Sequence, residues 1–282
     1  MSELTLLRIL LVASLAIAPL GTHRHFALGG REHRQGMPSR APITAHIVAL
    51  ACAAIALFTP FALASLGWLL FTAGSFAVFL RARVSSLRSP STLAACVPFL
   101  FSNIAAVWLV AGSNDLHLLG YGMHFSFYAA LHGTVLGWIL IGALAILADH
   151  ESPQRSLYVV AIAVCFVSFL LIALGIDQLH ALKIFGVIGL SIAIPIAQLA
   201  FLRDVWSRNR TAFALGCTSV CGLALTMFLA WRNELHLPVL VEIAGVRAMV
   251  SVHGVINTLI VAPSFLLAAV LDAHRPSLEA RR

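Results

Sequence analysis

Long apolar runs, separated by short polar segments, follow one another along the whole chain. A helix of about 20 apolar residues crosses the roughly 30 Å hydrocarbon core of a bilayer. Nine runs reach or approach this length, so the sequence predicts an all-α polytopic bundle of about nine transmembrane helices. The predicted spans are Leu4–Leu20, Ile43–Phe58, Phe61–Leu80, Thr92–Gly112, Met123–Ala148, Leu157–Gly175, Ile184–Leu202, Ala212–Trp231 and Val246–Leu271.

The second and third predicted spans are separated only by Thr59 and Pro60. A single helix over both would be about 57 Å long, nearly twice the thickness of the hydrocarbon core. Proline disfavours a helical conformation in the residue before it and commonly marks a turn. We therefore predict a tight hairpin at this point.

Composition places the chain in the membrane and excludes the soluble and disordered classes. Of its 282 residues, 60% are hydrophobic and 10% charged, whereas about a quarter of a soluble domain is charged. We predict a single transmembrane helical domain over residues 1–282. Its longest polar stretch, at 21–42, is predicted to be a basic cytoplasmic loop.

The net charge of +7 is distributed unevenly between the two sides of the predicted bundle. If the amino terminus is outside, fourteen of the 18 Lys and Arg residues fall on the inner side, as the positive-inside rule requires. This orientation puts the carboxyl terminus in the cytoplasm and predicts a multi-pass protein of the cell membrane. The expected partner of the basic loops is the lipid bilayer, with no nucleic acid, and the pattern predicts no oligomeric state.

Histidine is the ionisable residue that enters the predicted spans, which carry no Asp or Glu at mid-depth. In the fifth span His124, Tyr128 and His132 follow one another at i, i+4 and i+8, on one helix face. In the ninth, His253 and Asn257 are spaced i, i+4. Polar groups at this depth are expensive and commonly functional.

Two further residues belong to the same predicted layer in the outer half of the bilayer. Asn103 lies about 13 Å below the outer end of the fourth span, and Arg247 lies at the outer end of the ninth span. We predict that Asn103, Arg247 and the fifth- and ninth-span residues line a shared site. Hydrogen bonds that merely orient the helices are the alternative. The other histidines, His46 among them, are expected to be solvated or interfacial.

Two segments of the layer resemble signatures of a known family. Residues 124–130, HFSFYAA, and 253–257, HGVIN, are similar to the H-F-H-[YF]-A and H-G-x-x-N signatures of YndJ-like bacterial integral membrane proteins. Ser126 stands where that pattern has a second histidine, which leaves a His-x-His metal clamp incomplete. The resemblance implies a transporter-like membrane protein of the bacterial inner membrane and specifies no substrate.

Three functions remain open. In the first, the layer of a permease or binding protein receives a small or amphiphilic molecule, and His124, Tyr128, Asn103, Asn257 and Arg247 bind it. In the second, an intramembrane enzyme isomerises or cyclises a lipid-like or isoprenoid-like substrate, with His132 and His253 as its catalytic acid and base. The third is a haem or metal site in which His124 or His132 faces His253. We predict no cofactor for the first two.

Overall fold

The computed structural model describes residues 2–22, 41–149, 152–176, 179–235, 237, 242–243 and 245–273. Within these ranges, eight helices are long and apolar enough to cross a membrane, and one further apolar helix is shorter. This finding confirms the predicted polytopic all-α bundle and its number of apolar segments.

The chain folds into a succession of helices that is interrupted by one short pair of strands. In chain order the elements are α1 (Glu3–Ile17), α3 (Ala41–Phe58), η1 (Ala62–Ala64), α4 (Ser65–Arg83), η2 (Val84–Ser86), α5 (Pro90–Ser113), η3 (Leu118–Gly120), α6 (Met123–His132), η4 (Gly133–Leu140), α7 (Ile141–Asp149), α8 (Arg155–Gly175), α9 (His180–Val205), α10 (Arg210–Glu234), β1 (Glu242–Ile243), β2 (Val246–Arg247), η5 (Met249–Gly254), η6 (Asn257–Val261) and α11 (Ala262–Ala273).

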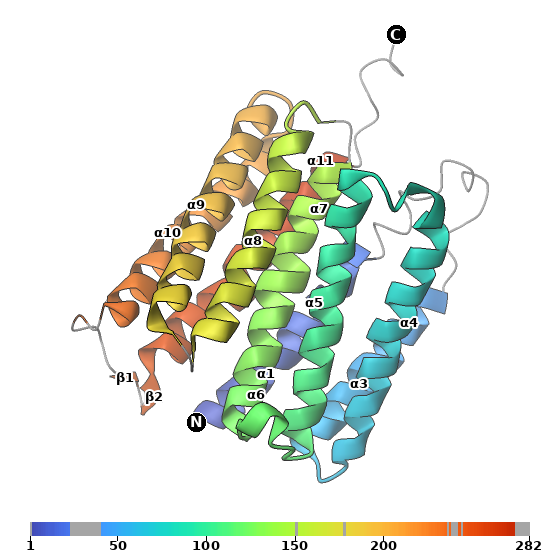
Figure 1. Ribbon diagram of the computed structural model, residues 1–282, viewed down its shortest axis with the longest axis vertical. Helices are drawn as coiled ribbons and strands as arrows, with labels where there is room; N and C mark the ends of the chain where they lie inside the picture. Colours follow the sequence, from blue (N-terminus) through green and yellow to red (C-terminus); the bar gives the residue numbers. More distant parts are fainter. Residues whose placement is uncertain are drawn as a thin grey trace.

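Successive spans run in opposite directions through the bundle (Figure 1). The end at which α1 begins also holds the starts of α6 and η5 and the end of α10, and we call it the Glu3 face. The opposite end, where α4 finishes, is the Arg83 face. The alternation is the one that the span prediction requires. Which face looks outward stays a prediction from the charge distribution.

Two boundaries test the pattern of apolar runs. Helix α3 ends at Phe58 and the chain turns into η1 at Ala62, which confirms the predicted hairpin. The predicted start of the ninth span, at Val246, is wrong, because Val246 pairs with Ile243 in two short antiparallel strands. Gly245, at φ +76°, turns the chain there, and glycine adopts this conformation without steric cost.

The span formed by α6, η4 and α7 lies at the centre of the bundle. Of its apolar window 89% is buried, against 28% for α8. Gly137 makes this possible, because a Cβ at this position would overlap the ring of Phe101 on α5. Small residues allow close helix approach in membranes, where packing replaces the hydrophobic effect as the driving force.

Paired charges hold the Arg83 face together. Arg83 donates to Asp149 at 2.7 Å and ties α4 to the end of α7. Arg208 likewise bonds Asp272 of α11 at 2.7 Å. Both carboxylates are almost fully buried and both are satisfied by a guanidinium, as buried charges require.

Candidate functional site

A cavity of about 840 Å³ lies inside the bundle. Its walls come mainly from α6, η4, α8, α9, α10, η5 and η6, and single residues of α1, η3, α5 and α11 also line it. Along α10 it reaches from Glu234 to Leu223, which corresponds to about 16 Å at the rise of an α-helix. Most of the lining is aliphatic or aromatic, so the few polar groups define its chemistry.

His132 is the last residue of α6, and its side chain opens into the cavity. Its Nδ1–H donates to the carbonyl of Tyr128 at 2.9 Å. A carbonyl only accepts, so this bond fixes the proton of the neutral ring on Nδ1. Nε2 is then a lone-pair acceptor, and it has no hydrogen bond with the residues that the structure describes.

His253 of η5 repeats this arrangement in the same cavity lining. Its Nδ1–H donates to the carbonyl of Thr226 at 3.0 Å, and the hydroxyl of Thr226 donates to Oδ1 of Asn257 at 3.0 Å. Two spans that are distant in sequence therefore present the same imidazole nitrogen to one cavity.

Sequence reasoning missed Thr226, although it orients both polar residues of the ninth span. A threonine in a span commonly bonds a carbonyl of its own helix, and the single hydroxyl proton of Thr226 is shared between Oδ1 of Asn257 and the carbonyl of Leu223 at 3.1 Å. No spacing along the chain distinguishes this threonine from others. Its role depends on the packing of α10 against η5 and η6.

Both histidine-bearing spans change from α- to π-helical geometry at the cavity. Segment η4 begins directly after His132, His253 lies in η5, and Asn257 begins η6. A π-turn adds a residue to the turn and redirects the side chains around it, and such turns are frequent at functional sites. The apolar pattern of the sequence carries no sign of them.

Tyr128 lines the cavity, and its hydroxyl belongs to a polar cluster at the Glu3 face. It donates to Glu3 at 2.7 Å and accepts from Arg247 at 3.0 Å. Arg247 bonds both oxygens of the same carboxylate, at 2.9 and 2.6 Å. Hydrogen bonding to Glu3 raises the pKa of the Arg247 guanidinium above its already high usual value.

The cluster changes the interpretation of Arg247. Sequence reasoning treated this residue as an anchor for a ligand, but its charge is balanced by Glu3, which that reasoning did not include. Arg247 does not belong to the cavity lining. The pair instead connects the start of α1 to β2, next to the wall that carries Tyr128.

Two other predicted site residues lie away from the cavity wall. Asn103 faces α4, where it accepts from Thr72 at 3.4 Å and donates to the carbonyl of Phe99 at 2.8 Å. His124 is exposed and is absent from the lining. At about 100° per residue it lies on the flank of the stripe formed by Phe125, Tyr128 and His132.

The cavity wall contains an ion pair that sequence reasoning did not assign to the site. Lys183 of α9 and Glu234 of α10 meet at 2.7 Å, and both line the cavity near the Glu3 face. Lys183 lies in the first turn of α9, and Glu234 is the last residue of the neighbouring antiparallel helix α10. The two side chains therefore meet at the same end of the bundle. Sequence alone placed them at span edges without pairing them.

The prediction that His46 is solvated or interfacial is wrong. It is 8% exposed, and its Nε2–H donates to the carbonyl of Leu15 at 3.1 Å. Its ring stacks on Phe71 with centroids 5.7 Å apart. Close packing of α1, α3 and α4 buries a residue that a count along the chain puts near a helix start.

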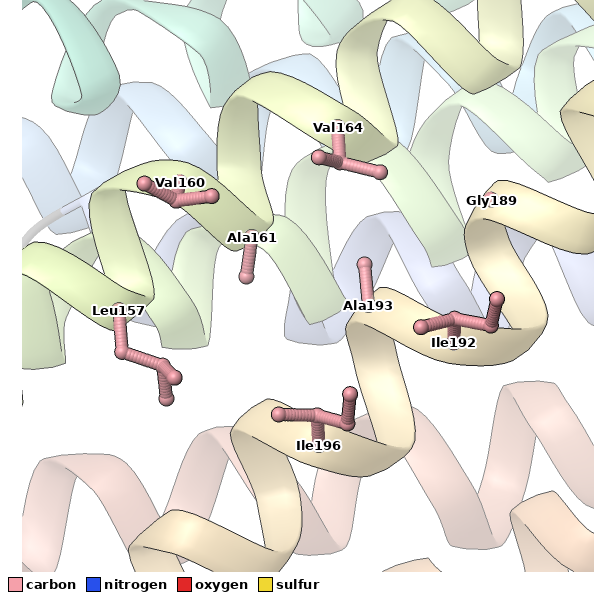
Figure 2. Close-up of a pocket in the computed structure, with 8 residues that line it drawn as sticks. All are labelled: Leu157, Val160, Ala161, Val164, Gly189, Ile192, Ala193 and Ile196. Atoms are coloured by element: carbon pink, nitrogen blue, oxygen red, sulfur yellow. The ribbon is translucent and has the colours of Figure 1, made fainter.

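A second hollow, of about 320 Å³, lies between α8 and α9. Figure 2 shows its lining, which is aliphatic apart from Gly189. Val160 is 60% exposed and Ile192 53%, so this hollow opens on the outer surface of the bundle. With no polar group to orient a ligand, it fits lipid chains packed against a membrane protein.

Comparison with known proteins decides the family. The model of the YndJ-like protein family matches residues 8–261. The chain belongs to the YndJ-like family. The match includes both segments that carried the resemblance, and it runs from Arg8, within α1, to the end of η6. No curated protein and no solved structure matches it.

The described part of this YndJ-like protein contains no cluster of three or more His, Cys, Asp or Glu side chains arranged to hold a metal ion. At the cavity, two imidazoles and the amide of Asn257 are the nearest equivalent. A haem or metal alternative would therefore depend on His132 and His253 as its protein ligands.

Proposed function

We propose that this membrane protein binds a small or amphiphilic molecule in the central cavity and transports it. The observation that carries the proposal is the cavity of about 840 Å³ on which His132, His253 and Asn257 converge. Ligand sites usually have volumes of about 300–1,000 Å³, with a few polar groups on a mostly apolar wall. A packed bundle without a ligand has no need of such a space.

The geometry of the helices supports transport in particular. Transporter sites commonly lie near the middle of the bilayer, where interrupted helices surround the substrate. Here η4, η5 and η6 interrupt the α-helical geometry of two spans beside the cavity. In the predicted orientation the cavity lies toward the outer half of the bilayer, and the ligand enters near the Glu3 face.

An intramembrane enzyme is the second candidate, and one observation favours it. His132 and His253 line the same cavity, and each ring is held by a bond at Nδ1. Two anchored imidazoles with Nε2 directed at a ligand could act as acid and base. Neither hydrogen bond involves a carboxylate, the partner that would stabilise an imidazolium most strongly.

Binding is tested first, with Trp108 as the reporter because its side chain lines the cavity. Terminally brominated long-chain alcohols and alkanes quench tryptophan emission on contact. We expect saturable quenching in the purified protein and its loss in Trp108→Phe, which identifies the responding residue among the five tryptophans. If no brominated probe quenches Trp108, the cavity is not a binding site and the proposal is wrong.

Transport and catalysis are then separated in proteoliposomes. The probe is an alkyl glucoside with a nitrobenzoxadiazole fluorophore on its chain, and dithionite bleaches only the outer leaflet. Transport predicts faster and more complete bleaching than in protein-free vesicles, with the probe recovered unchanged by mass spectrometry. A converted probe would favour the enzyme, and bleaching equal to that of empty vesicles would contradict transport.

A further inference from the structure

The two cavity histidines are held in the same hydrogen-bonding state by the backbone. Each Nδ1–H is committed to a carbonyl, that of Tyr128 for His132 and that of Thr226 for His253. In the neutral rings each Nε2 is therefore an acceptor without a donor among the described residues. Two such acceptors face one cavity, so the wall requires hydrogen-bond donors from whatever occupies it.

Asn257 supplies a hydrogen-bond donor beside them. Its side chain lines the cavity, and its Oδ1 accepts from the hydroxyl of Thr226 at 3.0 Å. The amide NH₂ has no partner among the described residues and is available as a donor. The neighbouring Thr258 is 1% exposed, and its buried Oγ1 is out of reach of a molecule in the cavity.

Together these groups match one kind of ligand head. Resting on the proposed function of the cavity, we infer that its ligand is an amphiphile with an uncharged hydroxyl head, bound between His132, His253 and Asn257. A hydroxyl donates one hydrogen bond and accepts others. It can therefore donate to an imidazole Nε2 and accept from the amide of Asn257. The apolar tail then lies along the aliphatic and aromatic wall.

Charged heads fit this wall poorly. Among the described lining residues, Lys183 and Glu234 carry the formal charges, and they are paired with each other at 2.7 Å. An ionised carboxylate would meet the lone pairs of two neutral imidazoles, and an ammonium group would lose its hydration without a free counter-charge. The hydroxyl of Tyr128 is already engaged with Glu3 and Arg247.

The test compares probes that share one brominated chain and differ at the head. The heads are a hydroxyl, a carboxylate, a trimethylammonium group and a plain hydrogen, and quenching of Trp108 measures the affinity of each. We expect the alcohol to bind about ten-fold more tightly than the alkane, because the alkane leaves buried polar groups unpaired. The carboxylate and the ammonium probe should bind more weakly than the alcohol.

Substitutions locate the head group. His132→Phe and His253→Phe keep an aromatic ring but remove Nε2, and each should lower alcohol affinity five- to ten-fold while alkane affinity stays unchanged. Asn257→Leu replaces the amide with an apolar side chain of similar size and should lower it about three-fold. His124→Phe, on the same helix but outside the lining, is the matched control and should bind every probe as the wild type does.

The outcomes distinguish this inference from the function on which it rests. If alcohol and alkane quench equally, if the carboxylate binds most tightly, or if the three cavity variants bind the alcohol normally, the inference is wrong while the cavity remains a binding site. Should His132→Phe or His253→Phe fail to fold, the four-probe comparison and Asn257→Leu decide. Quenching by none of the probes overturns the proposed function as well.

Discussion

His46 and the pair formed by His132 and His253 are histidines of the same bundle with different surroundings. His46 packs against Trp68 and Phe71, with ring centroids 6.1 and 5.7 Å away, and its Nε2–H donates to a carbonyl of α1. The other two are bonded at Nδ1 and present Nε2 to a cavity.

The difference teaches that a histidine in a span is not a site by itself. Where neighbouring side chains fill the space around the ring, the imidazole serves to join helices. Where the helices leave a cavity beside it, the same side chain can bind a ligand. Four experiments address this contrast, beginning with the largest expected effect.

Substitution of two neighbouring alanines on α6 tests whether the space beside this helix is open. Ala130 is 1% exposed in the core, whereas Ala129 lines the cavity. We expect Ala130→Phe to destabilise the protein by about 3 kcal/mol, because overpacking a filled core forces its neighbours to move. Ala129→Phe should cost less than about 1 kcal/mol and abolish quenching of Trp108 by the brominated alcohol. Thermal unfolding in detergent measures stability, and equal destabilisation by both would contradict the cavity.

His46→Ala should have the next largest effect on stability. It removes a buried ring and a hydrogen bond to α1, at a cost of about 2 kcal/mol, and should leave alcohol affinity unchanged in the folded fraction. His132→Ala serves as the counterpart, with weaker probe binding and a melting temperature near that of the wild type. The contrast between the histidines is wrong if His46→Ala weakens binding or if His132→Ala unfolds the protein.

Thr226→Val tests whether the hydroxyl of Thr226 holds Asn257 in position at the cavity wall. The carbonyl that holds His253 remains, but Asn257 loses the hydroxyl that bonds its Oδ1. Interhelical hydrogen bonds in membranes contribute about 0.6 kcal/mol on average, so we expect a small loss of stability and a two- to three-fold loss of alcohol affinity. Thr218→Val is the control, because Thr218 is exposed and bonds its own helix. Identical affinities of the two variants would exclude a supporting role for Thr226.

Arg247→Gln should have the smallest effect. The side chain of Arg247 is 60% exposed, and exposed ion pairs contribute about 0.2–1 kcal/mol, less at high salt. Glu3→Gln should cost about as much, and the double variant little more than either, in a double-mutant cycle of melting temperatures. Additive losses would show that Arg247 and Glu3 do not act as a pair. A several-fold loss of alcohol affinity in Arg247→Gln would show that Arg247 takes part in ligand binding.

Sequence reasoning was most successful where the bilayer imposes a one-dimensional rule. Span length follows from membrane thickness, so the bundle, its alternation and the hairpin after Phe58 could be predicted residue by residue. It failed at Val246, because a hydropathy pattern does not show that Gly245 turns the chain at positive φ. It also missed the π-turns, which depend on how neighbouring helices press on one another.

The candidate site was predictable only in part, for a related reason. His132, His253, Asn257 and Tyr128 were found because polar residues inside a span are conspicuous, and they do line one cavity. Asn103 has the same signature in sequence, yet it bonds Thr72 across a different helix contact. Helical spacing gives the face and the depth of a side chain, but not the helix that covers that face.

The sequence by itself determined the class of this YndJ-like protein, the order of its spans and the short set of polar residues inside them, because each depends on local hydropathy and spacing. Only the tertiary structure decided which of those residues share a space. Groups on neighbouring helices bond His46, Asn103 and Arg247, whereas His132 and His253 face an 840 Å³ cavity. Whether a polar group is satisfied is a property of the packed helices around it, and no single span contains that information.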